Sequence, residues 1–201
     1  MQLDYKNISL NTEWIKSGLD SIVYIESMSS TLDIALNKDH QIKDARKIVI
    51  TDNQTNGKGT HGKKWFSIPY KDLTFSLILG KDYYFTQDLI DQCCDAMLDV
   101  LSVYKIQGKV KHPNDIYVNN KKIIGMLLSN IQIDQENNKT YQALSIGMNV
   151  NSEIDIKKFD FDAKVSSTSL FLELNRLVNR EKLLKLMIEK IDAVIQKQVH
   201  Q

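Results

Sequence analysis

Two segments in the middle of the chain contain the side chains best suited to chemistry. The first covers residues 110–125 and reads VKHPNDIYVNNKKIIG. It places Lys111 and Lys122 on either side of the pair Asn114-Asp115, and the β-branched residues around that pair favour strands. A cationic turn between strands suits a reaction that joins two anions, because its positive charge offsets their repulsion. The alternative is a simple turn at Asn114-Asp115.

The second segment is a glycine- and lysine-rich stretch, residues 54–64, followed by Trp65. Its glycines let backbone N–H groups approach an anion closely, and its lysines add positive charge. Trp65 offers a flat face for stacking on a heterocycle. The glycine spacing fits neither a Walker loop nor a dinucleotide-binding fingerprint. A solvated surface loop is the alternative for this stretch.

Length and composition set the class of protein. The chain has 201 residues, 42% hydrophobic and 25% charged, which is enough for one domain with a substantial core. The 26 basic residues nearly balance the 25 acidic ones, so the net charge gives no argument for a nucleic-acid or membrane partner, and we expect neither. Cys93 and Cys94 are adjacent in a helical pattern, so we expect no disulfide. With no signal segment and no long apolar run, we expect a cytoplasmic protein.

Hydrophobic periodicity predicts interleaved strands and helices. Strands are expected at residues 21–26, 46–51, 72–79 (with one buried face) and 141–150, and a hairpin at 109–130 with its turn at Asn119-Asn120. Helices are expected to begin at three capping positions, Ser30-Thr31, Thr86 and Asn179. Residues 54–64 contain no apolar side chain and are expected to be a loop. This order predicts an α+β fold with a mixed or mostly antiparallel central sheet flanked by helices.

In these segments the sequence resembles the biotin protein ligases, within the wider biotin/lipoate ligase superfamily. Residues 57–65 resemble the family's Gly-Arg-Gly-x-x-Gly-x-x-Trp loop, and residues 72–76 its Asn-Leu-x-x-Ser strand. Residues 111–115 resemble Lys-Trp-Pro-Asn-Asp, and residues 122–127 resemble Lys-x-x-Gly-Ile-Leu. The resemblance runs from about residue 20 to the C-terminus, and several motifs in the same order make it specific.

The resemblance implies a class II aminoacyl-tRNA synthetase-like catalytic core and an ATP-dependent reaction in two steps. Biotin is adenylated to biotinyl-AMP, and a lysine of an apo biotin carboxyl carrier protein then accepts the biotinyl group. ATP with Mg²⁺ is expected, with no protein ligands assigned to the metal. The resemblance leaves a homodimer open.

The resemblance also implies roles for individual residues. The expected catalytic residues are Lys122, Lys111 and Asp115. The residues expected to bind biotin are Ser30, Thr31, Gln54, Gly57, Lys58, Gly59, Lys122 and Gly125. The residues expected to bind ATP or the adenylate are Lys58, Thr60, His61, Gly62, Lys63, Trp65, Asn114 and Asn149. Hydroxyl and amide side chains are apt for a ureido ring, which offers two N–H donors and one carbonyl acceptor.

The chain departs from the family pattern in its loop, where lysine, threonine and histidine stand in place of arginines. Because lysine lacks the bidentate grip of arginine, we expect a looser hold on the adenylate. We expect one catalytic domain over residues 1–201, without the family's winged helix or C-terminal β-barrel. Two alternatives stay open: a lipoate or octanoate ligase or transferase, and a non-catalytic biotin- or nucleotide-binding module.

Overall fold

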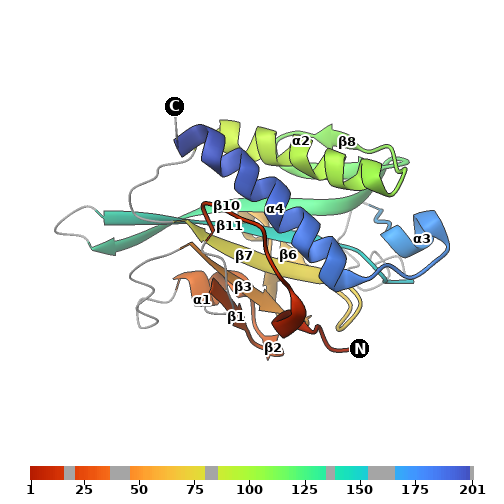
Figure 1. Cartoon of the computed structure of the whole chain (residues 1–201), viewed down its shortest axis with the longest axis horizontal. Coiled ribbons are helices and arrows are strands. Elements are labelled where there is room, and N and C mark those ends of the chain that lie inside the picture. Colours follow the sequence, from red (N-terminus) through yellow and green to blue (C-terminus); the bar gives the residue numbers. More distant parts are fainter. Residues whose placement is uncertain (16–20, 37–45, 80–85, 135–138, 154–165, 200–201) are drawn as a thin grey trace.

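A seven-stranded sheet forms the centre of the computed structural model, which describes residues 1–15, 21–36, 46–79, 86–134, 139–153 and 166–199 (Figure 1). Its order is β1-β3-β7-β11-β10-β9-β8. The strands are β1 (Ile22–Tyr24), β3 (Lys47–Thr51), β7 (Leu73–Leu79), β8 (Lys109–Lys111), β9 (Asp115–Val118), β10 (Lys121–Asp134) and β11 (Lys139–Met148). β1 and β3 are parallel, and the other neighbours are antiparallel. The predicted α+β class with a mixed sheet is confirmed.

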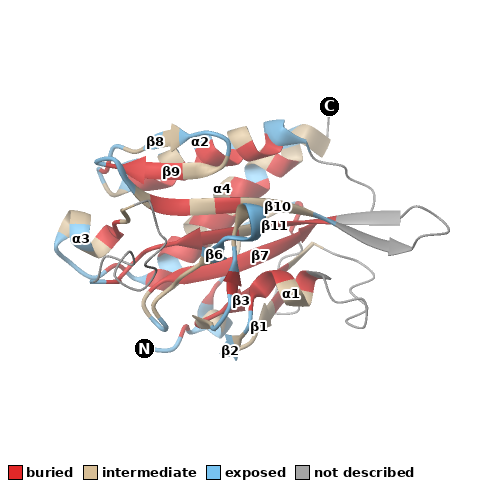
Figure 2. Ribbon diagram, turned by 180° about the vertical axis from the view of Figure 1, so that it is seen from behind, coloured by how far each residue is buried: buried red, intermediate tan, exposed pale blue. Residues whose placement is uncertain are grey.

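Helices cover the two faces of this sheet unequally. α2 (Gln87–Val103) and α4 (Arg180–Val199) pack together over one face, and the short α1 (Thr31–Leu36) lies on the other (Figures 1 and 2). α3 (Leu170–Leu174) lies between β11 and α4 in the order of the chain. Alternate strand residues point to opposite faces. Phe75 and Leu77 therefore join the α2–α4 core, whereas Ile78 packs in the α1 cluster.

The prediction of one buried face for the strand at 72–79 was wrong. Every residue of β7 is buried, including Thr74 and Ser76. The physical reason is the position of β7 inside the sheet, with α1 packed on its second face. The burial of Ser76 is important below, because a buried hydroxyl needs a hydrogen-bond partner.

The hairpin predicted at 109–130 is confirmed. Val118 pairs with Lys121, and Asn119 and Asn120 both have positive φ, 49° and 61°, which asparagine tolerates in tight turns. β8 pairs with β9 as a further antiparallel strand.

The loop predicted at 54–64 contains regular structure. β4 (Asn53–Gln54) pairs with β2 (Ser27–Met28), and β5 (Gly57–Lys58) pairs with β6 (Lys64–Trp65), with a 3₁₀ turn at Thr60–Gly62 between β5 and β6. The all-loop prediction was therefore wrong. These elements are too short to show a hydrophobic period, and their backbone hydrogen bonds alone define them.

The predicted helix starts have different outcomes. Asn179 accepts a hydrogen bond from the Lys182 N–H at 2.8 Å, which confirms it as the cap of α4. Thr86 precedes α2 as expected, but its side chain makes no capping hydrogen bond. Cys93 and Cys94 are unpaired and buried in α2, as predicted, and burial raises the pKa of both thiols.

The N-terminal segment is fastened to the sheet and to α4 by buried carboxylates. Asp52 accepts hydrogen bonds from the Leu3 N–H (2.8 Å), the Tyr24 hydroxyl (2.7 Å) and the Arg180 guanidinium (2.6 Å). Burial, together with the Asp52 hydrogen bond, raises the pKa of Tyr24 to about 12. On α4, Asp192 accepts the N–H group of Ile15 at 2.7 Å. These acids fix the segment before β1 against the sheet and α4.

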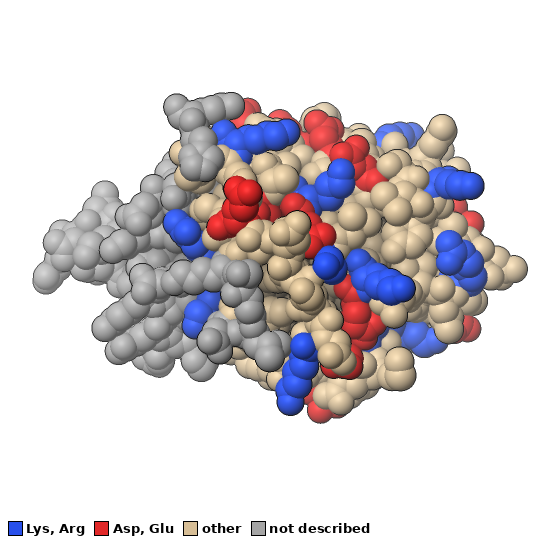
Figure 3. Space-filling view, viewed as in Figure 1, with Lys and Arg blue, Asp and Glu red and all other residues tan. Residues whose placement is uncertain are grey.

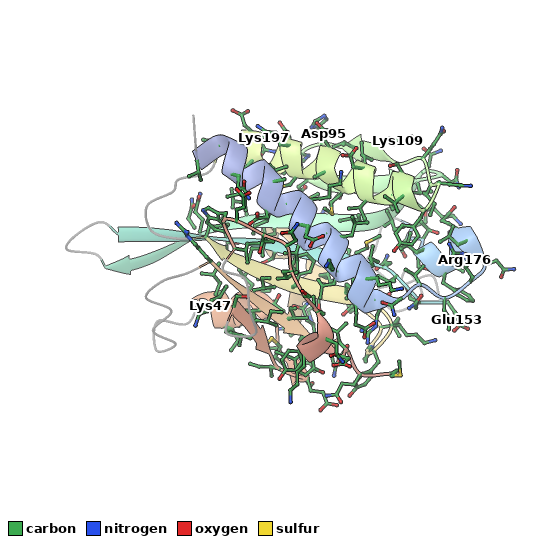
Figure 4. The ribbon with its side chains drawn as sticks, in the orientation of Figure 1. Lys47, Asp95, Lys109, Glu153, Arg176 and Lys197 are labelled. Carbon is green, nitrogen blue, oxygen red and sulfur yellow. The ribbon has the colours of Figure 1, made fainter. Side chains whose placement is uncertain are left out.

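The outer surface carries mixed charge. On the face formed by α2 and α4, basic and acidic side chains are interspersed (Figure 3). The labelled side chains Asp95, Lys109 and Arg176 lie at the periphery of the molecule and are exposed (Figure 4). Within the described part of the chain, no helix has the length and apolarity required to cross a bilayer.

Candidate active site

A cleft opens on the sheet face that α2 and α4 leave uncovered. Its lining residues come from α1, the β5–β6 hairpin and β9, β10 and β11. Figure 2 shows the sheet from the side on which α1 lies. The structure brings most of the predicted site residues together here, although the two key segments lie far apart in sequence. The predicted residues that do not line the cleft are Lys111, Gly57, His61, Gly62, Lys63 and Asn149.

Lys122 and Asp115 form the charged end of the cleft. The Lys122 Nζ lies 2.6 Å from the Asp115 Oδ1, and both side chains are about three-quarters buried, with exposed fractions of 26% and 23%. The Lys122 ammonium also lies 5.3 Å from the centre of the Trp65 ring, within range of a cation–π interaction. The site therefore holds a cation whose charge is already balanced by a carboxylate.

A β-bulge gives Lys122 its direction. Lys122 pairs with Tyr117 and Gly125 pairs with Asp115, so Ile123 is an extra residue between them. Residues three apart in a regular strand point to opposite faces. The inserted residue shifts that alternation by one and puts Lys122 and Gly125 on the same face, in the cleft.

The backbone of Lys122 is held from outside the sheet. Its N–H donates to the Ser166 carbonyl and its carbonyl accepts from the Thr168 N–H, both at 2.9 Å. Asn149 joins the same junction through its Nδ2, which donates to the Thr168 carbonyl at 2.9 Å. Its buried Oδ1 has no hydrogen-bond partner among the described residues. An unpaired buried acceptor is costly, so this oxygen is an acceptor that lacks a donor.

Two glycines form the floor of the cleft. Gly125 and Gly147 pair directly across β10 and β11, and the Trp65 ring lies over both. A Cβ atom at Gly147 would collide with the Trp65 indole, and one at Gly125 would come within 2.8 Å of the ring. Only glycine permits this approach of an aromatic ring to the backbone. The indole Nε1 is buried without a hydrogen-bond partner in the described part of the chain.

Replacing Gly147 with alanine is expected to displace Trp65. Overpacking of this kind should lower the free energy of unfolding by about 1–3 kcal/mol. In a Trp65→Ala background the obstacle is absent, so the same substitution should cost much less. Urea unfolding of the four proteins in this double-mutant cycle measures the coupling. An equal loss in both backgrounds would show that the ring does not rest on Gly147.

Hydroxyl and amide groups form the opposite, polar end of the cleft. The Gln54 Oε1 accepts hydrogen bonds from the Thr31 N–H (2.8 Å), the Thr31 hydroxyl (3.2 Å) and the Ser30 hydroxyl (3.4 Å). Thr31 begins α1 and Ser30 directly precedes it, whereas Gln54 ends β4. The β2–β4 pairing and the start of α1 together place these groups.

Lys58 is the second cation of the cleft, and it is also paired. Its ammonium contacts the carboxylate of Asp33 on α1, which also accepts a hydrogen bond from Ser29. Burial raises the pKa of Asp33, but the hydrogen bonds from Lys58 and Ser29 outweigh this effect and hold it below its ordinary value. Both lysines of the cleft are thus neutralised by carboxylates that an incoming anion can replace.

The remaining predicted residues lie around the cleft. The Lys111 Nζ lies 4.8 Å from the centre of the Tyr117 ring and does not reach the cleft lining. Asn114 lines the cleft, and its amide donates to the Met126 carbonyl. Gly57 is a buried residue of the hairpin itself, in β5, where a Cβ would collide with the Trp65 carbonyl oxygen. His61, Gly62 and Lys63 are exposed at the tip of the hairpin.

The sequence analysis assigned no role to four residues that build this site. Asp33 holds Lys58, Gly147 makes room for Trp65, and Ser145 lines the cleft. Ser76 lies beneath them and hydrogen-bonds both Thr31 and Ser145. Strand alternation was the available signal, since Ser145 and Gly147 occupy the same face of β11.

Comparison with known proteins agrees with this geometry. The model of the biotin/lipoate A/B protein ligase family matches residues 24–151. This match covers both the hairpin and the Lys122 region, and more than half of the chain. The chain belongs to the biotin/lipoate A/B protein ligase family. Family membership accounts for the two separated segments that form one cleft.

Among relatives of this ligase-family chain is the bifunctional ligase/repressor BirA of Bacillus spizizenii. It is 30% identical over 152 residues, which cover 74% of the chain and 46% of the relative. BirA of Bacillus subtilis is 27% identical, with coverage of 79% of the chain and 49% of the relative. The chain thus spans about half the length of the curated relatives it matches.

Solved structures show the same fold. A biotin protein ligase from Aquifex aeolicus in complex with biotin and ATP has a TM-score of 0.75 at 23% identity, covering 89% of this chain and 72% of that chain. The P. falciparum LipL1 in complex with lipoate has a TM-score of 0.55 at 12% identity, covering 88% and 63%. The fold is therefore common to proteins whose complexes contain different acids.

Proposed function

We propose that the protein is an ATP-dependent biotin–protein ligase that forms biotinyl-AMP and transfers biotin to a lysine of an apo biotin carboxyl carrier protein. The observation that carries the proposal is a cleft with a cationic end at Lys122 and a hydrogen-bonding end at Gln54 and Thr31. Biotin has the same polarity, with a carboxylate at one end and a ureido ring at the other. The similar solved structures that are named as biotin protein ligases support this assignment.

In the first step, a biotin carboxylate oxygen attacks the α-phosphorus of ATP and pyrophosphate leaves. The Lys122 ammonium leaves its ion pair with Asp115, contacts the two approaching anions and offsets their repulsion. Lys58 exchanges Asp33 for phosphate oxygens in the same way. Trp65 supplies a stacking face for adenine, and the unpaired Asn149 Oδ1, although outside the cleft lining, is an acceptor suited to the adenine amino group.

In the second step, the amine of the carrier lysine attacks the carbonyl of the mixed anhydride and AMP leaves. The amine must lose a proton, and Asp115, once released by Lys122, is the carboxylate of the cleft lining that can accept it. Asn114, whose amide is fixed by the Met126 carbonyl, stays beside this centre.

The donor set fits a Mg²⁺ ion that arrives with the triphosphate. Mg²⁺ in such sites is held by one or two carboxylates together with phosphate oxygens, and it neutralises phosphate charge. Asp115 is the carboxylate of the cleft lining, and the described residues contain no cluster of three or more metal-binding side chains. A resident metal site of that kind is therefore no part of the proposal.

Two further expectations belong to the proposal. We place the protein in the cytoplasm and treat the chain as one catalytic domain. The principal alternative is a lipoate or octanoate ligase, which shares the fold. The polar end of the cleft disfavours it, since a dithiolane or alkyl end gives no partner to Gln54.

Pyrophosphate release from ATP and Mg²⁺ tests the proposal, with biotin, lipoate, octanoate or no acid supplied. We expect release with biotin, followed by labelling of an apo carrier domain. Release with lipoate or octanoate in preference to biotin would show that the protein is a lipoate or octanoate ligase. Binding of biotin without release of pyrophosphate would show that the protein is a non-catalytic biotin-binding module.

A further inference from the structure

A series of hydrogen-bonded hydroxyl groups runs beneath the polar end of the cleft, and the reaction above assigns no role to two of its members, Ser76 and Ser145. The Ser145 Oγ on β11 lies 2.7 Å from the Ser76 Oγ on β7. The Ser76 Oγ lies 2.8 Å from the Thr31 Oγ1, which in turn lies 3.2 Å from the Gln54 Oε1. Ser76 is fully buried, at 0% exposure, whereas Ser145 lines the cleft.

The hydrogen bonds of this hydroxyl series all run in one direction, from Ser145 toward Gln54. The Thr31 backbone N–H, which can only donate, points to the Gln54 amide at 2.8 Å, so the atom it meets is the oxygen. An amide oxygen only accepts, and the Thr31 hydroxyl must therefore donate to it. The Thr31 oxygen then accepts from Ser76, and the Ser76 oxygen accepts from Ser145. Each hydroxyl has one proton, so each hydroxyl proton in the series is already used in a hydrogen bond to the next member.

This direction decides what the cleft offers to a ligand. The Ser145 proton is used on Ser76, and only its oxygen lone pairs remain for a ligand. The Gln54 Nε2, in contrast, only donates, and it makes no hydrogen bond to any residue that the structure describes. The polar end thus presents an acceptor and a donor, which match an N–H group and a carbonyl oxygen of one head group.

We propose that Ser145 is a specificity-determining residue that accepts a hydrogen bond from a ureido N–H, and that Ser76 is the positioning residue that makes Ser145 an acceptor. The inference rests on the proposed function and deepens it, because it states how a cyclic urea is chosen over an acid whose far end lacks polar groups.

The test is the binding of biotin, desthiobiotin and lipoate by calorimetric titration of the full chain. Ser145→Ala is expected to weaken both urea-containing acids roughly threefold to tenfold, the effect of one neutral hydrogen bond. Lipoate, which has no urea, should change less than twofold. Ser76→Ala leaves the cleft lining intact but frees the Ser145 proton. Like Ser145→Ala, it should lower the ratio of biotin affinity to lipoate affinity.

Ser129→Ala is the matched control. Ser129 lies on the neighbouring strand β10, opposite Ala143, and does not line the cleft. The Ser129→Ala variant should have the same ratio of biotin affinity to lipoate affinity as the native protein. Thermal unfolding should show that every variant is folded. If native protein prefers biotin and Ser145→Ala weakens all three acids equally or none, the inference is overturned and the ligase proposal stands. If native protein does not prefer biotin to lipoate, the ligase proposal itself is overturned.

Discussion

Replacing Lys122 with alanine is expected to lower biotin-dependent pyrophosphate release by about 10²–10³-fold, the usual cost of losing a group that stabilises developing charge. The loss has two parts. The ammonium that offsets the repulsion between carboxylate and phosphate is removed, and Asp115 is left in the cleft without the partner that lies 2.6 Å away. An unpaired carboxylate repels both anionic substrates.

Lys121 provides the matched control for this prediction. It is adjacent in sequence and has the same charge, but it is exposed and lies outside the cleft lining. Lys121→Ala should therefore keep native rates. If Lys122→Ala and Lys121→Ala release pyrophosphate equally fast, Lys122 has no part in adenylation.

Replacing Arg180 with methionine is expected to lower the free energy of unfolding by about 3–5 kcal/mol, the cost of leaving one member of a buried ion pair alone. The Asp52 and Arg180 side chains are 1% and 6% exposed and lie 2.6 Å apart. Arg180 also donates to the Asp72 carbonyl and the Met1 carbonyl. The substitution therefore disturbs the adjoining ends of β3 and β7 and the N-terminal segment together.

Urea unfolding measures this effect, with Arg176→Met as the control. Arg176 is exposed and projects outward near α3 (Figure 4), and surface changes usually cost less than about 0.5 kcal/mol. Adding Asp52→Asn to Arg180→Met removes the unpaired charge and should restore part of the stability. Equal unfolding midpoints for the Arg180 and Arg176 variants would contradict the prediction.

The sequence by itself determined the features that depend on local pattern. Alternation located the central strands, two adjacent asparagines located the β9–β10 turn, and Asn179 located the start of α4. The spaced glycine–lysine and lysine–asparagine–aspartate motifs indicated the family. All of these signals operate within a few residues of the chain, where backbone conformation and burial leave a regular mark.

Tertiary structure alone decided how the site is assembled. The extra residue Ile123 puts Lys122 and Gly125 on one face, and periodicity does not reveal such a bulge. Ser145 meets Ser76 across 69 positions of sequence, and Arg180 meets Asp52 across 128. Such pairs form because buried polar groups must find partners wherever the fold brings them. A polar residue in a strand pattern shows the need for a partner but not which partner it finds.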